Sequence, residues 1–501
     1  MTDKQITAEE NSDKNERQGA NWDLSNAVRN YSTLVAAQVA VAFFSFASVW
    51  LATRNLGTEG YGGIVAVIAA SQVAQIFVNW TCISLARYGV EEFVETGEIG
   101  KTFWARSFIL LPNTLVFLAL SFLWLPIISG WLKLPPEAIW YVIAHFLVQA
   151  VWIHVQYALQ GAKLPRLQGV LLAVERIIIF SGLLILVLSG KLTYLSATAI
   201  YIASPFLMTF IGLFQLRKLI SWHIRFDTEI LKKILKFSVP LIPFYLTGYL
   251  TTNYLDAIFI SQYLSKSDLG IYSVAYQING ILMQFPTLAG SLILPFFVTL
   301  QASKSIEKVK LYMEDILPLL TLFGGLLSIC AAFAMQIFIP FLFGQEINQA
   351  VIIFWILMSS AVFAIPGIIG YSPYFNSFSI TYIATIMAVI AAVVNFFANF
   401  FLIPRYGLKG CAWATVLAYG ASILTVMFIA RRKYSLKTKW TLPAILPALA
   451  GSAYASWTEN LWVALLLAFG VAFAIVLIYR NSFMQGIKLL SDYRKLLSNR
   501  A

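Results

Sequence analysis

Residues 349–370 read QAVIIFWILMSSAVFAIPGIIG and contain no charged side chain. A bilayer's hydrocarbon core is about 30 Å thick, and a helix that rises 1.5 Å per residue crosses it with around 20 apolar residues. The stretch therefore predicts a membrane-spanning helix. The whole chain has this character, since 59% of its 501 residues are hydrophobic and 12% are charged. Soluble domains carry about 25% charged residues, so the composition predicts an all-α polytopic membrane protein.

Similar apolar runs recur along the sequence and predict about fourteen spans. The weakest is 441–457, which is short and contains two prolines. The predicted spans are 32–53, 61–84, 105–129, 138–160, 167–189, 193–215, 238–262, 271–298, 317–340, 349–370, 379–403, 408–430, 441–457 and 461–480.

A basic segment separates the first six spans from the other eight. We therefore expect two six-helix lobes and two further helices. The first thirty residues are polar and contain no signal peptide, so we expect them to be helical only close to the membrane, if at all. The predicted divisions are a cytoplasmic polar tail (1–30), an N-terminal lobe (31–216), a basic cytoplasmic linker (217–237), a C-terminal lobe (238–432), two additional spans (433–480) and a basic cytoplasmic tail (481–501).

Two turns at equivalent places in the lobes resemble one another. Residues 55–63 read NLGTEGYGG and residues 264–272 read LSKSDLGIY. Each turn combines an acidic residue with a glycine near the start of the next helix, Gly62 or Gly270. Parallel repeats of this kind are a common transporter plan, with the substrate path between the lobes.

The distribution of basic residues predicts the orientation. The net charge is +12, and in a membrane protein this excess indicates retention of Lys and Arg on the cytoplasmic side rather than nucleic-acid binding. With both termini inside, Arg176 lies within a span and the outer face keeps only Arg54, Lys133, Lys191, Lys266, Arg405 and Lys409.

The sequence carries no pattern typical of a cofactor or metal site. Cys82, Cys330 and Cys411 are far apart, and His145 and His154 are about 180° apart around one helix. The segment GEIGKT at 97–102 lacks the first glycine of a phosphate-binding loop. We therefore expect a secondary transporter without cofactor or metal, rather than an enzyme.

Polar residues at helical spacing mark the first two spans of each lobe. Such stripes indicate either hydrogen bonds between helices or a shared cavity, and their recurrence at equivalent places favours the cavity. The stripes are Gln38, Ser45 and Ser48; Gln72, Gln75, Asn79 and Cys82; Tyr249, Thr252, Asn253 and Asp256; and Ser273, Tyr276, Gln277 and Gln284.

Charged residues within spans are few. Arg176 and Glu175 lie on the fifth span, and because adjacent residues point about 100° apart we do not expect a ready-made ion pair. Asp256 lies on the seventh span, about 10 Å from Arg176 in depth, which is too far for direct contact. Arg87 and Arg106 lie near the inner face and fit the role of interfacial anchors.

Three stretches resemble a known family. Residues 231–278 read LKKILKFSVPLIPFYLTGYLTTNYLDAIFISQYLSKSDLGIYSVAYQI, residues 395–420 read NFFANFFLIPRYGLKGCAWATVLAYG, and residues 52–63 read ATRNLGTEGYGG. They are similar to the polysaccharide-repeat (Wzx-type) flippases of the multidrug/oligosaccharidyl-lipid/polysaccharide exporter superfamily. The likeness in span count and spacing extends over nearly the whole chain.

The resemblance implies a bacterial inner-membrane protein that flips an undecaprenyl-pyrophosphate-linked oligosaccharide among membrane lipids, with a polysaccharide polymerase and chain-length proteins as partners. It also implies a cationic cavity between the lobes and coupling to an ion gradient. Ala257 follows Asp256 where the family commonly has a basic residue. The predicted substrate-binding residues are Arg176, Arg87, Asn79, Gln75, Asn253 and Gln277, and the predicted ion-coupling residues are Asp256 and Glu175.

Three alternatives remain open from the sequence. A lipid II flippase also has fourteen helices, but usually carries a second Arg and an Asp where this chain has Gly57 to Gly60. A drug/cation antiporter would bury acids in its first lobe, and the first span has none. A membrane-embedded glycan polymerase or acyltransferase would need a large outer loop or clustered catalytic Arg, His or Asp, which the sequence lacks.

Overall fold

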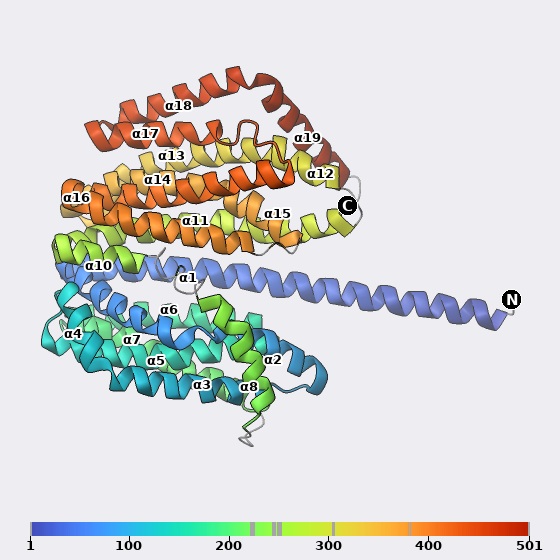
Figure 1. The fold of residues 1–501 in the computed structure, drawn as a ribbon, viewed down its shortest axis with the longest axis horizontal. Helices are drawn as coiled ribbons and strands as arrows, with labels where there is room; N and C mark the ends of the chain where they lie inside the picture. The colour runs from blue at the N-terminus through green and yellow to red at the C-terminus, as the bar shows by residue number, and fades with distance from the viewer. Residues whose placement is uncertain are drawn as a thin grey trace.

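The computed structural model describes residues 3–220, 226–242, 247, 253–302, 306–378, 380 and 382–498. Within these residues the chain is helical and contains no strand. Figure 1 shows two groups of roughly parallel helices, with the long helix α1 running between them. The predicted all-α membrane fold is therefore confirmed.

The first group, which we call the N-lobe, lies below α1 in Figure 1. Its helix α1 bends at Gly57, whose φ of +70° is in the left-handed region that favours glycine. The two arms of α1 correspond to the first two predicted spans. The helices are α1 (Asp3–Asn79), α2 (Cys82–Thr96), α3 (Gly100–Ala119), α4 (Ser121–Trp131), α5 (Pro136–Gly161), α6 (Pro165–Leu188) and α7 (Tyr194–Leu216).

The second group, which we call the C-lobe, follows the amphipathic helix α8 (Thr228–Ser238) and the 3₁₀ turn η1 (Val239–Leu241). Its long helix α16 bends at Gly407, whose φ is +58°. The helices are α10 (Asn253–Tyr263), α11 (Lys266–Ala302), α12 (Ile306–Leu311), η2 (Tyr312–Ile316), α13 (Leu317–Phe343), η3 (Gln345–Ile347), α14 (Gln349–Pro366), η4 (Gly367–Tyr371), α15 (Ser372–Ser377) and α16 (Tyr382–Tyr434).

The remaining helices pack on the outside of the C-lobe. The short turn η5 (Pro443–Ile445) leads into α17 (Leu446–Thr458), which pairs with α18 (Leu461–Ile478), and α19 (Arg480–Ser498) ends the described chain. Figure 1 shows α17 and α18 as a hairpin over α13 and α14.

Nine helices of the described residues are long and apolar enough to span a membrane by length and composition. Two of them, Thr33–Asn79 and Tyr382–Tyr434, contain the bends at Gly57 and Gly407, and each covers two predicted spans. Part of the predicted span 238–262 lies outside the described residues. The count of fourteen stays a prediction.

Some segments outside the predicted spans are helical, and one predicted span is divided. Helix α1 begins at Asp3, so the polar tail is helical along its described length and not only close to the membrane; it contains no proline that would interrupt the helix. The basic linker and the C-terminal tail also form helices, α8 and α19. The predicted span 105–129 is divided at Leu120 between α3 and α4.

The lobes meet closely at the end of the bundle where α1 bends, which we call the bend end. A Cβ atom added to Gly62 would lie 2.0 Å from the carbonyl oxygen of Lys266, and one added to Gly270 would lie 2.0 Å from that of Thr58. The hydroxyl groups of Thr58 and Ser267 are 2.6 Å apart and hydrogen-bond across the same contact. The two turns that resemble one another in sequence therefore pack against each other, with backbone on backbone.

We predict that Gly270→Ala opens the bend end. The added methyl group cannot fit 2.0 Å from a backbone oxygen, so the lobes must separate there. A cysteine introduced at Val65, which is 8% exposed and lines the space between the lobes, should react faster with a maleimide in detergent-solubilised protein.

The matched control is Gly280→Ala on the same helix, because a Cβ atom there meets nothing within 4 Å. Equal labelling rates in the two variants would show that this glycine contact does not hold the lobes together.

Candidate functional site

A cavity of about 300 Å³ lies between the lobes. The N-lobe contributes both arms of α1 together with α5, α6 and α7, and the C-lobe contributes α10 and α11. Its polar lining comes from Ser45, Ser48, Tyr61, Gln72, His145, Gln149, Glu175, Arg176, Tyr201, Tyr254, Gln277 and Gln284. The cavity lies where the repeated architecture predicted a substrate path.

Arg176 is the one cationic side chain that lines this cavity in the described chain. Its side chain is 34% exposed, and Nη2 lies 3.8 Å from Oε1 of Glu175. The expectation that these neighbours form no ion pair is wrong, because the long arginine side chain can turn toward the preceding residue. At 3.8 Å the contact is longer than a hydrogen bond. The guanidinium group makes no hydrogen bond within the described part of the chain, so its donors are available to a ligand.

Glu175 is held more firmly than Arg176. Its side chain is 4% exposed, and Oε2 accepts a hydrogen bond of 2.8 Å from Nε1 of Trp152. Its backbone carbonyl accepts a second bond, of 2.8 Å, from the hydroxyl of Ser204 on α7. These contacts fix the carboxylate at the cavity wall, where it sets the position of the Arg176 cation.

The predicted site residues fall into separate groups. Gln277 lines the cavity with Arg176 and Glu175, whereas four others lie elsewhere: Gln75, Asn79, Arg87 and Asp256. Helix α10 begins at Asn253, and the side chain of that residue lies outside the described residues.

Gln75 and Asn79 belong to a buried network inside the N-lobe. The side-chain amide of Gln75 donates a hydrogen bond of 2.7 Å to the carbonyl of Phe146, and its oxygen accepts one of 2.5 Å from the amide of Asn79. The Oδ1 atom of Asn79 accepts 2.9 Å from Nη2 of Arg106. The two amides therefore hydrogen-bond to other helices instead of facing the cavity. For these two residues, the stripe reflects hydrogen bonds between helices and not a cavity lining. Their role in substrate binding stays a prediction.

The sequence suggested that Arg106 is an interfacial anchor. This is wrong, because the residue is fully buried. Its Nη1 atom also contacts Nδ1 of His154, which must accept because arginine has only donors. The Nε2 atom of His154 lies 3.1 Å from the hydroxyl of Ser107. The hydrogen bonds that Arg106 of α3 donates to Asn79 on α1 and His154 on α5 offset the cost of burying the cation.

Arg87 lies on the surface of α2. Its side chain is 54% exposed, its Nε lies 3.7 Å from Glu91, and its guanidinium lies 4.7 Å from the ring centroid of Phe237 at the end of α8. Its interfacial position stays a prediction. The predicted contact of Arg87 with substrate stays a prediction.

Asp256 lies in a second buried cluster, inside the C-lobe. Asp256 is 2% exposed. Its carboxylate accepts a hydrogen bond of 2.6 Å from the hydroxyl of Tyr272 and one of 2.8 Å from Nδ2 of Asn399. The same Nδ2 donates 3.0 Å to Asn395, and Thr415 lies 3.4 Å from the Tyr272 hydroxyl. As expected, Asp256 is not paired with Arg176, and the described residues offer it no cation.

Sequence reasoning missed several cavity residues. His145 and Gln149 on α5 have the i, i+4 spacing that places them on one helix face, and this pattern was a usable signal. Tyr61, Tyr201 and Tyr254 also line the cavity, but single tyrosines in apolar runs carry no spacing signal. No group of three His, Cys, Asp or Glu residues that could hold a metal ion occurs in the described ranges.

Residues 27–301 match the model of a family described as "Polysaccharide biosynthesis protein". Among solved structures, the fold is similar to a lipid II flippase, MurJ, in an inward closed conformation, with a TM-score of 0.66 and 15% identity over 91% of this chain and 99% of the other. It is also similar to an inward-facing multidrug resistance MATE family transporter, with a TM-score of 0.56 and 12% identity over 80% and 98%. No curated protein matches the sequence.

We predict that Arg106→Met destabilises the protein by about 3 kcal/mol, because Asn79 and His154 lose a charged donor in a buried site. Arg87→Met should change the stability by less than about 1 kcal/mol, because the Arg87 pair is exposed to solvent. Thermal unfolding of both variants in one detergent measures the difference. Equal midpoints would contradict a structural role for the Arg106 network.

Proposed function

Because the chain belongs to the family of polysaccharide biosynthesis proteins, we propose that it flips an undecaprenyl-pyrophosphate-linked oligosaccharide across the bacterial inner membrane. The transported repeat unit serves the assembly of a surface polysaccharide: O-antigen, capsule or exopolysaccharide. The fold is that of a multi-pass membrane transporter. Transport proceeds by alternating access of the cavity between the lobes.

Arg176 is the observation that carries this proposal. It places a cation with unused hydrogen-bond donors in the space between two lobes of a membrane protein. Burying an arginine in a membrane is costly and marks a pathway or a binding site. The planar guanidinium matches the oxygens of a pyrophosphate, which is the charged part of the proposed substrate.

The neutral part of the lining suits a sugar. Gln72, Gln149, Gln277 and Gln284 bring side-chain amides to the cavity from α1, α5 and α11. An amide both donates and accepts hydrogen bonds, as a sugar hydroxyl does. Arg176 therefore binds the pyrophosphate, and the glutamines bind the sugar nearest to it.

The volume of about 300 Å³ indicates a closed state. It is at the lower limit for a small-molecule site, so an oligosaccharide can enter only when the lobes separate. The contact between Gly62 and Gly270 closes the bend end. We assign this end to the outer face, as the distribution of basic residues predicts, with both termini cytoplasmic.

Arg176→Ala should stop transport without loss of protein. The expected result in cells is missing surface polysaccharide and accumulation of the lipid-linked repeat unit on the cytoplasmic leaflet. In proteoliposomes the flipping rate should fall at least tenfold, which corresponds to a rise of about 1.4 kcal/mol in the activation free energy. Arg176→Lys should retain part of the rate because it keeps the charge but not the fork.

Arg166→Ala is the matched control, because this arginine lies on the same helix and does not line the cavity. Normal surface polysaccharide in Arg176→Ala at normal protein level would contradict the proposal. Accumulation of lipid II instead of the repeat unit would assign the chain to peptidoglycan synthesis.

We further propose that Asp256 couples transport to an ion gradient. The Asp256 carboxylate is 2% exposed and its hydrogen-bond partners are neutral. Burying a negative charge without a compensating cation is costly. A proton or a small cation would relieve this cost. The Oδ1 atom of Asn399 is buried without a hydrogen-bond partner among the described residues, so it is an available oxygen ligand beside the carboxylate.

Asp256→Asn should remove the response to the ion gradient. The amide keeps the shape of the side chain but not its charge. Flipping by the unchanged protein in proteoliposomes should rise under either an imposed pH gradient or an imposed Na⁺ gradient, and flipping by Asp256→Asn should respond to neither. Glu346→Gln, at an exposed position of the C-lobe, is the control. An equal response of the Asp256→Asn variant would remove Asp256 from the coupling mechanism.

A further inference from the structure

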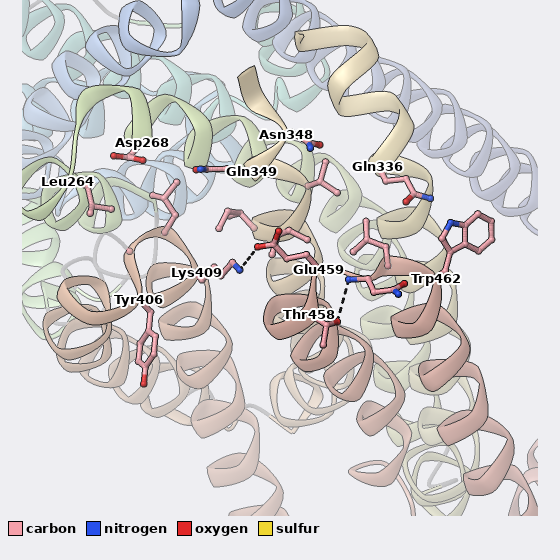
Figure 2. Close-up of a pocket in the computed structure, with 17 residues that line it drawn as sticks. Leu264, Asp268, Gln336, Asn348, Gln349, Tyr406, Lys409, Thr458, Glu459 and Trp462 are labelled. Atoms are coloured by element: carbon pink, nitrogen blue, oxygen red, sulfur yellow. Dashed lines mark hydrogen bonds and ion pairs between the residues drawn. The ribbon is translucent and has the colours of Figure 1, made fainter. Parts of the chain in front are cut away.

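A second pocket of about 880 Å³ lies at the bend end of the C-lobe. Its walls are the turn between α10 and α11, the starts of α14 and α18, and the bend of α16 at Gly407. Figure 2 shows Trp462 on one side of the pocket and Tyr406 on the other. This pocket shares no residue with the cavity that contains Arg176.

The charged side chains of this pocket already have hydrogen-bond partners, and its one lysine is paired with an acid. Nζ of Lys409 donates 2.7 Å to Glu459 and 2.9 Å to the carbonyl of Ser456. Asp268 accepts bonds from the backbone and hydroxyl of Ser265. The pocket therefore offers no uncompensated cation to a phosphate or an anionic headgroup.

The neutral amides of the pocket are available. Gln336, Asn348 and Gln349 line it from α13 and the start of α14. None of the three amides forms a hydrogen bond with any other part of the chain that the structure describes. An amide offers two donors and an acceptor, which suits a neutral ligand rich in hydroxyl groups.

Aromatic side chains complete the lining. Trp462 is 65% exposed, and the Phe333 ring packs edge-on against it with centroids 4.6 Å apart. Tyr406 is 64% exposed. An indole or phenol ring is a large, rigid surface with a polar edge, and it can cover the apolar face of a sugar ring.

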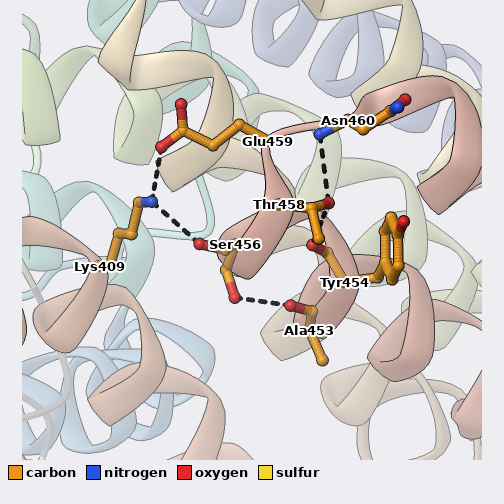
Figure 3. A network of polar contacts seen from close by, with 7 residues as sticks. All are labelled: Lys409, Ala453, Tyr454, Ser456, Thr458, Glu459 and Asn460. Atoms are coloured by element: carbon orange, nitrogen blue, oxygen red, sulfur yellow. Dashed lines mark hydrogen bonds and ion pairs between the residues drawn. The ribbon is translucent and has the colours of Figure 1, made fainter.

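The turn between α17 and α18 is held in an unusual conformation. Glu459 has a φ of +60°, which is uncommon for a residue other than glycine. Figure 3 shows Lys409 bonded to both Glu459 and Ser456, while Thr458 and Asn460 are bonded to each other within the turn. Lys409 thereby ties the appended hairpin to α16, and this contact fixes one wall of the pocket.

We propose that this pocket binds the sugar part of the oligosaccharide on the outer face of the membrane. The inference rests on the proposed function for the identity of the glycan and for the orientation. Its own basis is the combination of unused amides, exposed rings and a lining lysine that is already paired with an acid, which favours a neutral hydroxyl-rich ligand over an anion. The pocket lies at the end of the bundle where the glycan emerges, so it holds the delivered head group after the lobes have released the pyrophosphate.

The test uses the full-length protein in nanodiscs and the repeat-unit oligosaccharide released from the host's lipid-linked pool by mild acid. Saturation-transfer NMR titration measures its dissociation constant. Gln349→Ala and Trp462→Ala should each weaken binding about tenfold, and inorganic pyrophosphate should not displace the glycan.

Two control variants locate the binding site. Trp457→Ala removes a neighbouring tryptophan that is 87% exposed and does not line the pocket, and Gln485→Ala removes an exposed amide of α19 that lines neither the pocket nor the central cavity. Both should bind the released glycan within twofold of the unchanged protein. Absence of binding, unchanged binding by both pocket variants, or displacement by pyrophosphate would overturn the proposal.

A separate measurement distinguishes failure of this proposal from failure of the proposed function. If the unchanged protein flips the lipid-linked repeat unit but the pocket variants bind the free glycan normally, only the outer glycan site is wrong. If the protein does not flip that lipid, the proposed function is wrong, whatever the glycan titration gives.

Discussion

The cost of placing a charge inside a membrane determines how this structure is arranged. Three ionisable side chains deep in the helical bundles meet that cost in different ways. Arg106 is fully buried and bonded to Asn79 and His154, and Asp256 accepts bonds from Tyr272 and Asn399. Arg176 faces a cavity and makes only a loose contact with Glu175. The first two charges hold helices of one lobe together, whereas the third faces the cavity without a hydrogen bond to the described chain.

The same constraint explains how much of the site could be predicted from the sequence. Polar stripes identified the two arms of α1 and helix α11 as cavity-lining, because side-chain spacing is a local property. Gln277 and Gln284 line the cavity, but Gln75 and Asn79 bind Phe146 and Arg106. The stripe containing Gln72, Gln75 and Asn79 spreads around enough of its helix to face two neighbours. Its division between a cavity and an interhelical contact depends on packing that the sequence of one helix does not contain.

Fold class was easier to predict than residue roles, because span length and hydrophobicity follow directly from the thickness of the bilayer. The errors arose where tertiary contacts override local rules. Arg87 and Arg106 look alike in the sequence, yet the first is exposed and the second is buried, because α3 faces α5 at the level of His154. Adjacent side chains diverge around a helix, yet Arg176 turns back to within 3.8 Å of Glu175. A long side chain can bend toward a neighbouring cavity, and helical spacing alone does not predict the direction in which it bends.

The contact between the lobes suits repeated opening. At the bend end, Gly62 and Gly270 bring backbones together. Hydrogen bonds between the lobes join Thr58 to Ser267, Lys133 to the carbonyl of Leu264, and Trp50 to the carbonyl of Leu342. A typical hydrogen bond contributes only about 1 kcal/mol. Close backbone packing therefore closes this end of the bundle, while the free energy needed to separate the lobes there stays small. Each lobe stays rigid meanwhile, because its buried charges are bonded to helices of that lobe.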